Sequence, residues 1–332
     1  MKPTEGPLSL YHAEIPGFLT PFLDAPALRR LEGVGMNCGC EYTDFPRFRA
    51  LPAYSRYRHS LGAALIVWHF TEDRAQTLAA LFHDLATPVF AHVIDFLRGD
   101  YLRQEATEAR TGELLRGSPE IAALLEEMGI PFEAVEDYHR YPIADNDAPR
   151  LSADRLEYTL GNLRGFGFAA PEELSRWYGD LRVAAAPDGL PELAFSSLEA
   201  ARGFGFAALR CSRVYVSDED RYAMQMLAEL VADALRRGVL AEDDLWRTEP
   251  ELIEKLCANA KSGRAWKSFR AMSRMRTDEG APIEKRRVIL AKKRRIDPLI
   301  AGRGRLSELD TAFRHETKAF LAEPQTAWLC GE

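Results

Sequence analysis

The sequence predicts a mainly α-helical protein with one small β-hairpin and additional helices in its C-terminal part. Over most of the chain, apolar residues recur every three or four positions, which is the period of a helix with one buried face. The exception is 181–195, where the segments LRVAA and LPELAF flank a Pro187-Asp188-Gly189 turn, as in a hairpin. Of the 332 residues, 46% are hydrophobic and 28% are charged, a composition typical of globular proteins with a packed core.

The N-terminal half predicts a series of helices around one loop. Segment 18–31 has apolar residues at helical spacing, with Thr20 as a cap and Pro21 directly after it. A loop rich in glycine, proline and aromatic residues is expected over 33–54. Pro88 is expected to open a helix, because proline fits the first turn. The further helices expected in this half are 59–70, 72–85, 88–97, 119–128 and 151–163.

After the hairpin, helical spacing returns over 197–214 and over the long amphipathic stretch 218–238. The net charge is −7, but segment 261–305 holds fifteen Lys and Arg against four Asp and Glu, a local excess of +11. The overall acidity argues against a protein that coats nucleic acid. The basic stretch 285–295 could meet nucleic acid locally, but a solvated face or a contact between subunits is the better interpretation.

Several features favour a cytoplasmic protein with no membrane partner. The longest apolar runs are only a few residues, too short to span a bilayer. The N-terminus, MKPTEGPLSLYHAE, has one lysine and no apolar block behind it, unlike a secretory signal. Five cysteines, few and mostly scattered, fit a reducing compartment. The Cys38-Gly-Cys40 pair lacks a second pair to complete a zinc site, so we interpret it as part of a loop.

Four polar residues form the candidate site: His59, the adjacent His83 and Asp84, and Asp154. Imidazole and carboxylate together suit one divalent cation such as Mn, Fe, Ni, Zn or Mg. Two histidines and two aspartates leave coordination positions open for water and a phosphate oxygen. The alternative is that His59 and His83 are ordinary histidines, hydrogen-bonded in the core or at the surface. We assume this ordinary role for four further histidines. These four are His12, His69, His139 and His315.

The flanks of these residues form three motifs in a fixed order. They are Arg56-x-x-His59-Ser-Leu-Gly, His83-Asp84-Leu-x-x-Pro-x-Phe-x-His92 and Asp154-Arg155-Leu156-Glu157-Tyr158. This pattern resembles the HD-domain phosphohydrolase superfamily, and its flanks resemble the dNTP triphosphohydrolase branch. The resemblance covers roughly residues 15 to 245 and includes the segment 26–31 and the hairpin. It implies an HD-domain helical core over 15–165, completed by 166–245 and followed by a basic C-terminal region over 246–332.

The resemblance also implies roles for single residues. The metal would be held by His59, His83, Asp84 and Asp154. The substrate would be contacted by Arg56, His92 and Arg155 at the phosphate, by Tyr158 at the sugar, and by residues at the positions of Thr87 and Asn162. Asp84 or Glu108 would accept the proton of the attacking water, and His92 would assist at the phosphate.

Three positions depart from the family pattern. Thr87 stands where the branch has a second histidine, and Thr107 stands where it has a further one, followed by Glu108. Threonine is not a general acid near neutral pH. Asn162 stands where the branch has a carboxylate that binds the sugar 3′-hydroxyl, and it can still form a hydrogen bond there.

The resulting prediction is a metal-dependent phosphohydrolase in which metal-activated water attacks the phosphorus of a nucleotide, a dNTP, NTP or related phosphate compound. The alternative is a nucleotide-binding or regulatory HD-domain protein with weak catalysis, which the two threonines favour and the complete ligand set disfavours. Related enzymes assemble, so the resemblance also allows a homo-oligomer, although nothing in the composition demands one.

Overall fold

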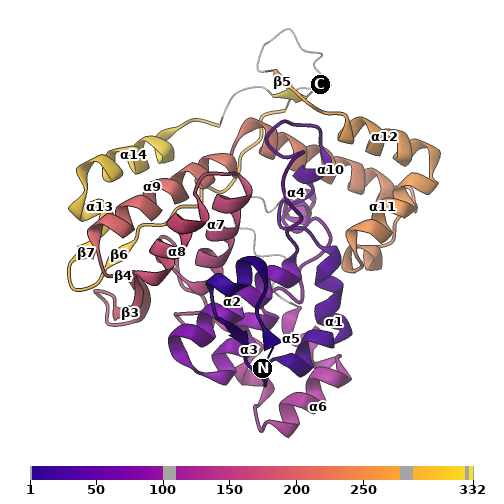
Figure 1. Cartoon of the computed structure of the whole chain (residues 1–332). Helices are drawn as coiled ribbons and strands as arrows, with labels where there is room; N and C mark the ends of the chain where they lie inside the picture. The colour runs from indigo at the N-terminus through magenta and orange to yellow at the C-terminus, as the bar shows by residue number, and fades with distance from the viewer. Residues whose placement is uncertain (1, 100–109, 277–286, 326–328, 332) are drawn as a thin grey trace.

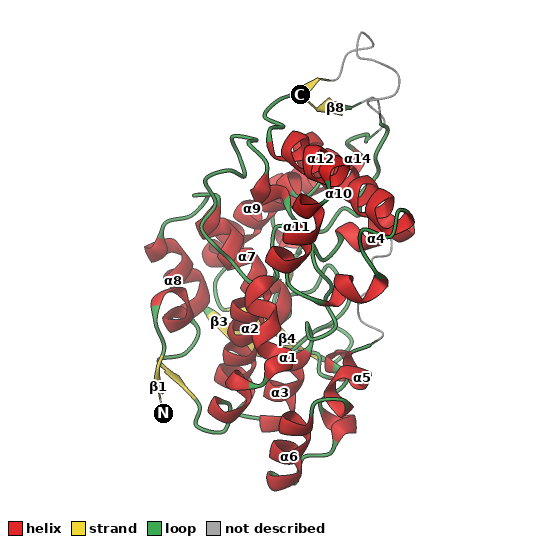
Figure 2. Ribbon diagram, turned by 90° about the vertical axis from the view of Figure 1, so that its right-hand side faces the viewer, coloured by secondary structure: helices red, strands yellow, loops and turns green. Residues whose placement is uncertain are grey.

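The computed structural model describes residues 2–99, 110–276, 287–325 and 329–331. Helices dominate these residues, which confirms the mainly α-helical prediction (Figures 1 and 2). None of the described helices is both long and apolar enough to cross a bilayer.

The elements have the following bounds. The α-helices are α1 Pro26–Arg29, α2 Arg56–Thr71, α3 Arg74–Phe82, α4 Val93–Arg98, α5 Thr111–Arg116, α6 Pro119–Glu127, α7 Ala153–Gly165, α8 Pro171–Gly179, α9 Leu198–Val214, α10 Asp218–Arg236, α11 Glu249–Ala258, α12 Ala260–Arg270, α13 Leu306–Leu309 and α14 Thr311–Ala322. The short 3-10 helices are η1 Gly6–Leu10, η2 Thr20–Asp24, η3 Arg30–Gly33, η4 Cys40–Tyr42, η5 Phe132–Ala134, η6 Tyr138–Arg140 and η7 Glu242–Trp246. The strands are β1 Lys2–Pro3, β2 Glu14–Ile15, β3 Leu181–Ala185, β4 Pro191–Phe195, β5 Met275–Arg276, β6 Leu299–Ile300, β7 Gly304–Arg305 and β8 Cys330–Gly331.

The predicted hairpin is confirmed and is part of a larger sheet. Strands β3 and β4 pair antiparallel, with Leu181 opposite Phe195. On its other side, β4 pairs in parallel with β6, and β7 completes the order β3-β4-β6-β7. The C-terminal region therefore packs against the middle of the chain through backbone hydrogen bonds.

The central helix α2 begins earlier than the periodicity suggests. The Ser55 side chain caps it by accepting a hydrogen bond from the backbone N–H of Arg58, 3.3 Å away. The helix therefore starts at Arg56, one turn before His59, and both side chains are buried. Helix α2 packs against α3 and α7, which brings the three predicted motifs together (Figure 1).

The helix expected over 18–31 is instead three short pieces, η2, α1 and η3. Each of the first two has a proline in its first turn, Pro21 and Pro26. The residue before Pro26, Ala25, is extended, with φ −60° and ψ 130°. A proline disfavours the helical conformation of the residue before it, so the chain bends there and starts a new helix.

The helix expected to open at Pro88 begins only at Val93. Phe90 and Ala91 have positive φ, 57° and 46°, a left-handed conformation that a helix cannot contain. Tertiary hydrogen bonds hold this turn: the N–H of Val89 donates to the carbonyl oxygen of Leu245 over 2.9 Å. The turn directs His92 away from the position that a continuous helix would give it.

Two clusters of buried apolar side chains form the interior. The first includes residues of α2, α3, α7, α8 and α9. The second includes residues of α4, α10, α11 and α12, which lie together at one end of the molecule (Figures 1 and 2). Phe82 and Leu156 belong to the first cluster, and Phe90 and Val93 to the second. The predicted site residues therefore lie close to the meeting of the two clusters.

The buried carboxylate of Glu249 supports the turn before His92, and Glu41 lies beside it. The Glu249 carboxylate accepts hydrogen bonds from the N–H groups of Gly35 and Phe90, over 2.9 and 3.3 Å, and from the hydroxyl of Tyr42 over 2.8 Å. Beside it, Glu41 Oε2 is buried without a hydrogen-bond partner among the described residues. Burial, together with the charge of Glu249, raises the pKa of Glu41 from 4.5 to about 8.

We expect Glu41→Gln to make folding stability less sensitive to pH. The unfolded chain releases the Glu41 proton near pH 4.5, whereas the folded protein keeps it up to about pH 8. Wild-type stability should therefore fall as pH rises between these values, by at most about 1.4 kcal/mol per pH unit from this group. Denaturant unfolding at pH 5 and pH 8 measures this, and an equal decline in wild type and variant would contradict it.

Candidate metal centre

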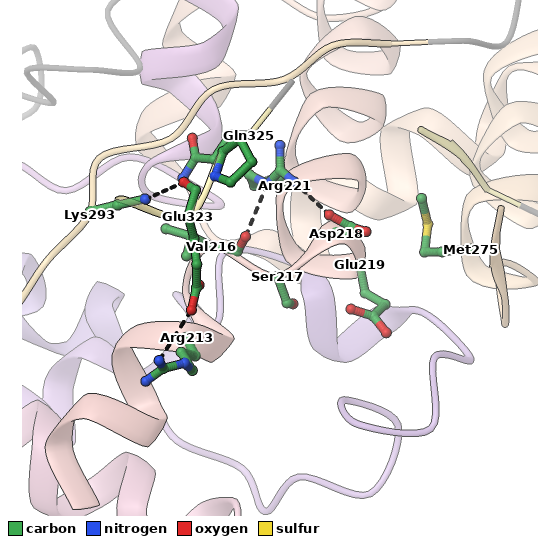
Figure 3. Close-up of a pocket in the computed structure, with 11 residues that line it drawn as sticks. Arg213, Val216, Ser217, Asp218, Glu219, Arg221, Met275, Lys293, Glu323 and Gln325 are labelled. Carbon is green, nitrogen blue, oxygen red and sulfur yellow. Dashed lines mark hydrogen bonds and ion pairs between the residues drawn. The ribbon is translucent and has the colours of Figure 1, made fainter. Parts of the chain in front are cut away.

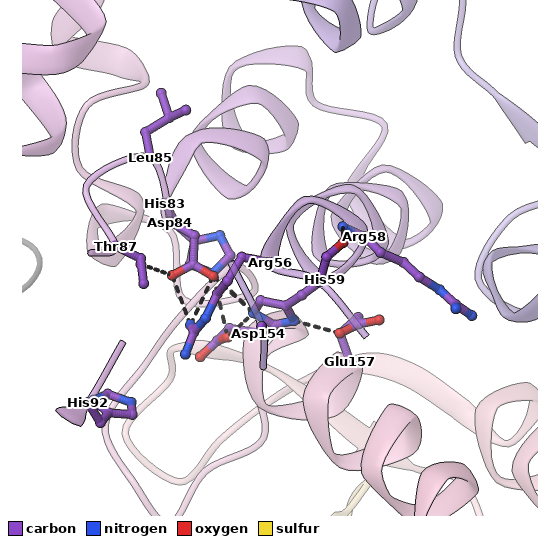
Figure 4. Close-up of polar contacts among 12 residues, drawn as sticks. Arg56, Arg58, His59, His83, Asp84, Leu85, Thr87, His92, Asp154 and Glu157 are labelled. Carbon is purple, nitrogen blue, oxygen red and sulfur yellow. Dashed lines mark hydrogen bonds and ion pairs between the residues drawn. The ribbon is translucent and has the colours of Figure 1, made fainter. Parts of the chain in front are cut away.

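Three segments bring the candidate ligands together. His59 lies on α2, His83 and Asp84 follow the last residue of α3, and Asp154 lies in the first turn of α7 (Figure 4). Helix α7 starts at Ala153 because the Ser152 side chain caps it, accepting from the N–H of Arg155 over 3.3 Å. The cap places the Asp154 carboxylate near a helix N-terminus, where negative charge is favoured.

The ligand atoms are close enough to share one ion. His59 Nε2 lies 3.2 Å from His83 Nε2 and 3.0 Å from Asp154 Oδ1, and His83 Nε2 lies 3.7 Å from the same oxygen. Asp84 Oδ2 lies 3.5 Å from His83 Nε2 and 3.8 Å from His59 Nε2. Neighbouring ligands at right angles around an ion with bonds of about 2.1 Å are about 3 Å apart, so the spacing fits such an ion.

The second nitrogen of each histidine fixes which nitrogen faces the cluster. His83 Nδ1 lies 2.7 Å from the carbonyl oxygen of Ala80, and His59 Nδ1 lies 2.5 Å from the carboxylate of Glu157. Both partners only accept, so each Nδ1 carries a proton and Nε2 is the nitrogen that each ring presents to the cluster. The two Nε2 atoms lie 3.2 Å apart, and a histidine whose Nδ1 is held by an acceptor while Nε2 faces the site is the arrangement that metal-binding histidines adopt.

The pKa shifts of the cluster residues show the effect of the carboxylates around His59. Burial alone would lower the pKa of His59, but hydrogen bonds to Asp154 and Glu157 outweigh it and raise the pKa to about 10. Burial would raise the pKa of Asp84, but Arg56, His83 and His59 hold it well below its usual range. The pKa of Asp154 is also held low, chiefly by its hydrogen bond to His59. The cluster therefore attracts a cation at neutral pH.

Exposure indicates the open side of the cluster. The side chain of His59 is 1% exposed and that of Asp84 is 8% exposed, whereas that of Asp154 is 20% exposed. Solvent therefore reaches the cluster on the side of Asp154.

Two residues predicted to contact substrate lie against Asp84. Arg56 Nη1 donates to both carboxylate oxygens of Asp84, over 3.0 and 3.1 Å, and Thr87 Oγ1 donates to Oδ1 over 2.6 Å. Arg30 holds the same turn by donating to the carbonyl oxygens of Leu85 and Thr87, over 2.9 and 2.8 Å. Arg56 and Thr87 thus fix the orientation of the Asp84 carboxylate.

The predicted substrate contacts on α7 are also in contact with protein groups. Arg155 donates to the carbonyl oxygen of Arg150 and to Asn146 Oδ1, and it lies 3.1 Å from Asp145. Asn162 donates to the hydroxyl of Tyr215 over 2.8 Å. The Tyr158 ring lies 6.5 Å from the His59 ring and 6.2 Å from the Tyr215 ring, beside the cluster.

His92 lies to one side of the four candidate ligands (Figure 4). Its Nδ1 lies 2.8 Å from the fully buried carboxylate of Asp95, so this nitrogen carries the proton. Its Nε2 accepts from Arg294 Nη2 over 3.3 Å. Glu108, predicted as an alternative base, lies outside the described residues.

Sequence reasoning assigned no role to four residues that support the site. They are Glu157, Tyr138, Asp95 and Arg294. Glu157 could have been found, because it lies three residues after Asp154 and therefore on the same face of α7. The ring of Tyr138 packs 5.0 Å from that of His83, but no spacing in the sequence relates these two residues.

Comparison with known proteins gives two distant relatives. The uncharacterized protein YdhJ of Bacillus subtilis is 25% identical over 250 residues, which cover 74% of this chain and 72% of the relative. The metal-dependent phosphohydrolase cns2 of Cordyceps militaris is 26% identical over 299 residues, covering 86% of this chain and 81% of the relative. No family model matches the chain.

Proposed function

We propose that this protein is a metal-dependent phosphohydrolase of the HD-domain superfamily and that a nucleotide is its substrate. The observation that carries the proposal is the convergence of His59 Nε2, His83 Nε2 and Asp154 Oδ1, which lie 3.0–3.7 Å apart. Asp84 Oδ2 lies 3.5 and 3.8 Å from the two imidazole nitrogens. The distant relative named metal-dependent phosphohydrolase supports the same reaction class. A divalent ion in this cluster would activate water and neutralise phosphate charge.

The protein groups around the cluster prepare it for this reaction. Glu157 and the carbonyl oxygen of Ala80 hold the two imidazoles with Nε2 toward the ion. Arg56 and Thr87 keep Asp84 ionised and fixed in orientation. Because burial lowers the pKa of His92, its ring is neutral at pH 7 and offers Nε2 as an acceptor on the substrate side.

The nucleotide is supported by the aromatic side chains next to the cluster. Tyr158 is half-buried, in contact with the rings of His59 and Tyr215, and could pack against a sugar or base. One observation favours the alternative, a nucleotide-binding protein with weak catalysis. The hydroxyl of Thr87 donates a hydrogen bond to Asp84. It therefore supplies no general acid at the position where the dNTP triphosphohydrolase branch has a histidine.

The test is a panel of nucleoside tri-, di- and monophosphates, each with Mn, Mg, Ni or Fe, and with products resolved as phosphate, pyrophosphate or triphosphate. We expect hydrolysis of at least one compound, loss of this activity in EDTA, and recovery when the metal is restored. Elemental analysis of the purified protein identifies the ion. A metal-loaded protein that binds nucleotides but hydrolyses none would favour the regulatory alternative, and a protein that binds no divalent ion would contradict the proposal.

A further inference from the structure

The C-terminal segment 287–298 is anchored on both sides of Arg294. Before it, Arg287 pairs with Glu229 over 2.8 and 2.9 Å, and Lys293 donates to the carbonyl oxygens of Phe320 and Leu321 over 2.8 and 2.9 Å. After it, the N–H of Asp297 donates to the carbonyl oxygen of Pro149 over 2.8 Å, and the chain continues into β6. The described residues of this segment make contacts within the chain, while Val288 and Leu290 remain exposed.

A hollow of about 440 Å³ lies next to this segment and includes Lys293 in its lining (Figure 3). Its cationic groups already have protein partners: Arg213 pairs with Glu323, Arg221 pairs with Asp218, and Lys293 is bound to carbonyl oxygens. Lys293, one residue before Arg294, is therefore held in place by its hydrogen bonds to the protein.

The side chain of Arg294 reaches the predicted substrate side of the metal centre. Its Nη2 lies 3.3 Å from His92 Nε2, although the two residues are 202 positions apart in the sequence. Burial raises the pKa of Tyr158 to about 12, and the positive charge of Arg294 opposes this rise. The guanidinium group therefore lies near both His92 and Tyr158, the two side chains predicted to meet phosphate and sugar.

The arginines that the sequence predicted for phosphate binding make other contacts. Arg56 donates to both oxygens of Asp84, and Arg155 contacts Asp145 and Asn146. A phosphate group needs cationic donors as well as the metal ion, and arginine suits it best because its planar fork matches two oxygens. A bond from arginine to phosphate is assisted by charge on both partners, so it is stronger than the contact between Arg294 Nη2 and His92 Nε2.

We propose that Arg294, beside His92, binds the phosphate oxygens of the substrate, so that the C-terminal segment completes the active site. This inference rests on the proposed function. It assigns a substrate-binding residue to a part of the chain that lies beyond the three sequence motifs.

The experiment compares Arg294→Met and Arg294→Lys with the matched control Arg295→Met, which removes the same charge from the adjacent position. Binding of inorganic phosphate and of inorganic triphosphate to the metal-loaded protein is measured by calorimetry. Metal content and kinetics on the best substrate of the nucleotide panel are measured in parallel. We expect Arg294→Met to weaken binding of whichever anion, phosphate or triphosphate, the wild-type protein binds more tightly. We also expect it to raise KM by about tenfold or more. Arg294→Lys should recover part of the loss, and Arg295→Met should remain within about twofold of wild type.

The outcomes separate this inference from the proposed function. A wild-type protein that hydrolyses phosphate compounds, with Arg294→Met unchanged in binding and KM, would overturn the role of Arg294 only. Equal losses in Arg294→Met and Arg295→Met would also overturn it, because they would reflect the general charge of the segment. A wild-type protein that neither binds these probes nor hydrolyses any nucleotide would reject the proposed function itself.

Discussion

Asp154→Asn is expected to reduce phosphohydrolase activity by at least about a thousandfold and to leave the purified protein with little bound metal. Asp154 Oδ1 lies within 3.0–3.7 Å of both histidine Nε2 atoms, so the substitution removes a negative charge at the centre of the cluster. A bound cation stabilises the transition state by several kcal/mol, and each step of about 1.4 kcal/mol changes the rate tenfold. Elemental analysis after dialysis and steady-state kinetics measure the two effects.

The matched control is Asp147→Asn, which makes the same change in charge at an exposed position in the loop before α7. This control should keep its metal and activity. Asp154→Asn removes no apolar contact, and its side chain is partly exposed, so the variant should still fold. Full metal content and near-normal turnover in Asp154→Asn would show that the cluster is not the metal centre.

Glu157→Gln is expected to weaken metal binding by about 10- to 100-fold, the usual effect of removing a carboxylate that orients a metal-binding histidine. Glu157 Oε2 accepts from His59 Nδ1 over 2.5 Å and also from the hydroxyl of Tyr54. An amide oxygen is a weaker acceptor, so it holds the His59 ring less firmly and makes Nε2 a poorer ligand. Titration of the metal-free protein with Mn or Zn measures the change in affinity.

The control for Glu157 is Tyr54→Phe. This substitution removes the second hydrogen bond of the same carboxylate and leaves the one to His59 intact. It should lower the free energy of unfolding by about 1 kcal/mol with little change in metal affinity. If Tyr54→Phe and Glu157→Gln weakened metal binding equally, the effect of Glu157 would be one of general packing and not of histidine orientation.

The sequence predicted the elements whose causes lie within a few residues. The helix stripes and the hairpin around Gly189 each depend on neighbouring side chains and on hydrogen bonds to nearby backbone atoms. Local proline chemistry also explains the break at Pro26, although periodicity alone missed it. His59, His83 and Asp154 were named from their motifs, and the structure brings their ligand atoms together.

Only the tertiary structure decided what the remaining polar groups contact. The left-handed turn at Phe90 depends on hydrogen bonds that its N–H groups donate to η7 and α11, far along the chain. The contact of Arg294 with His92 joins segments 202 residues apart. An arginine in a motif has a charge but no fixed partner until helices pack, and here Arg56 binds Asp84 while Arg155 binds Asp145. Local hydrogen bonding determines helices and caps, whereas the partners of long polar side chains depend on how distant elements pack together.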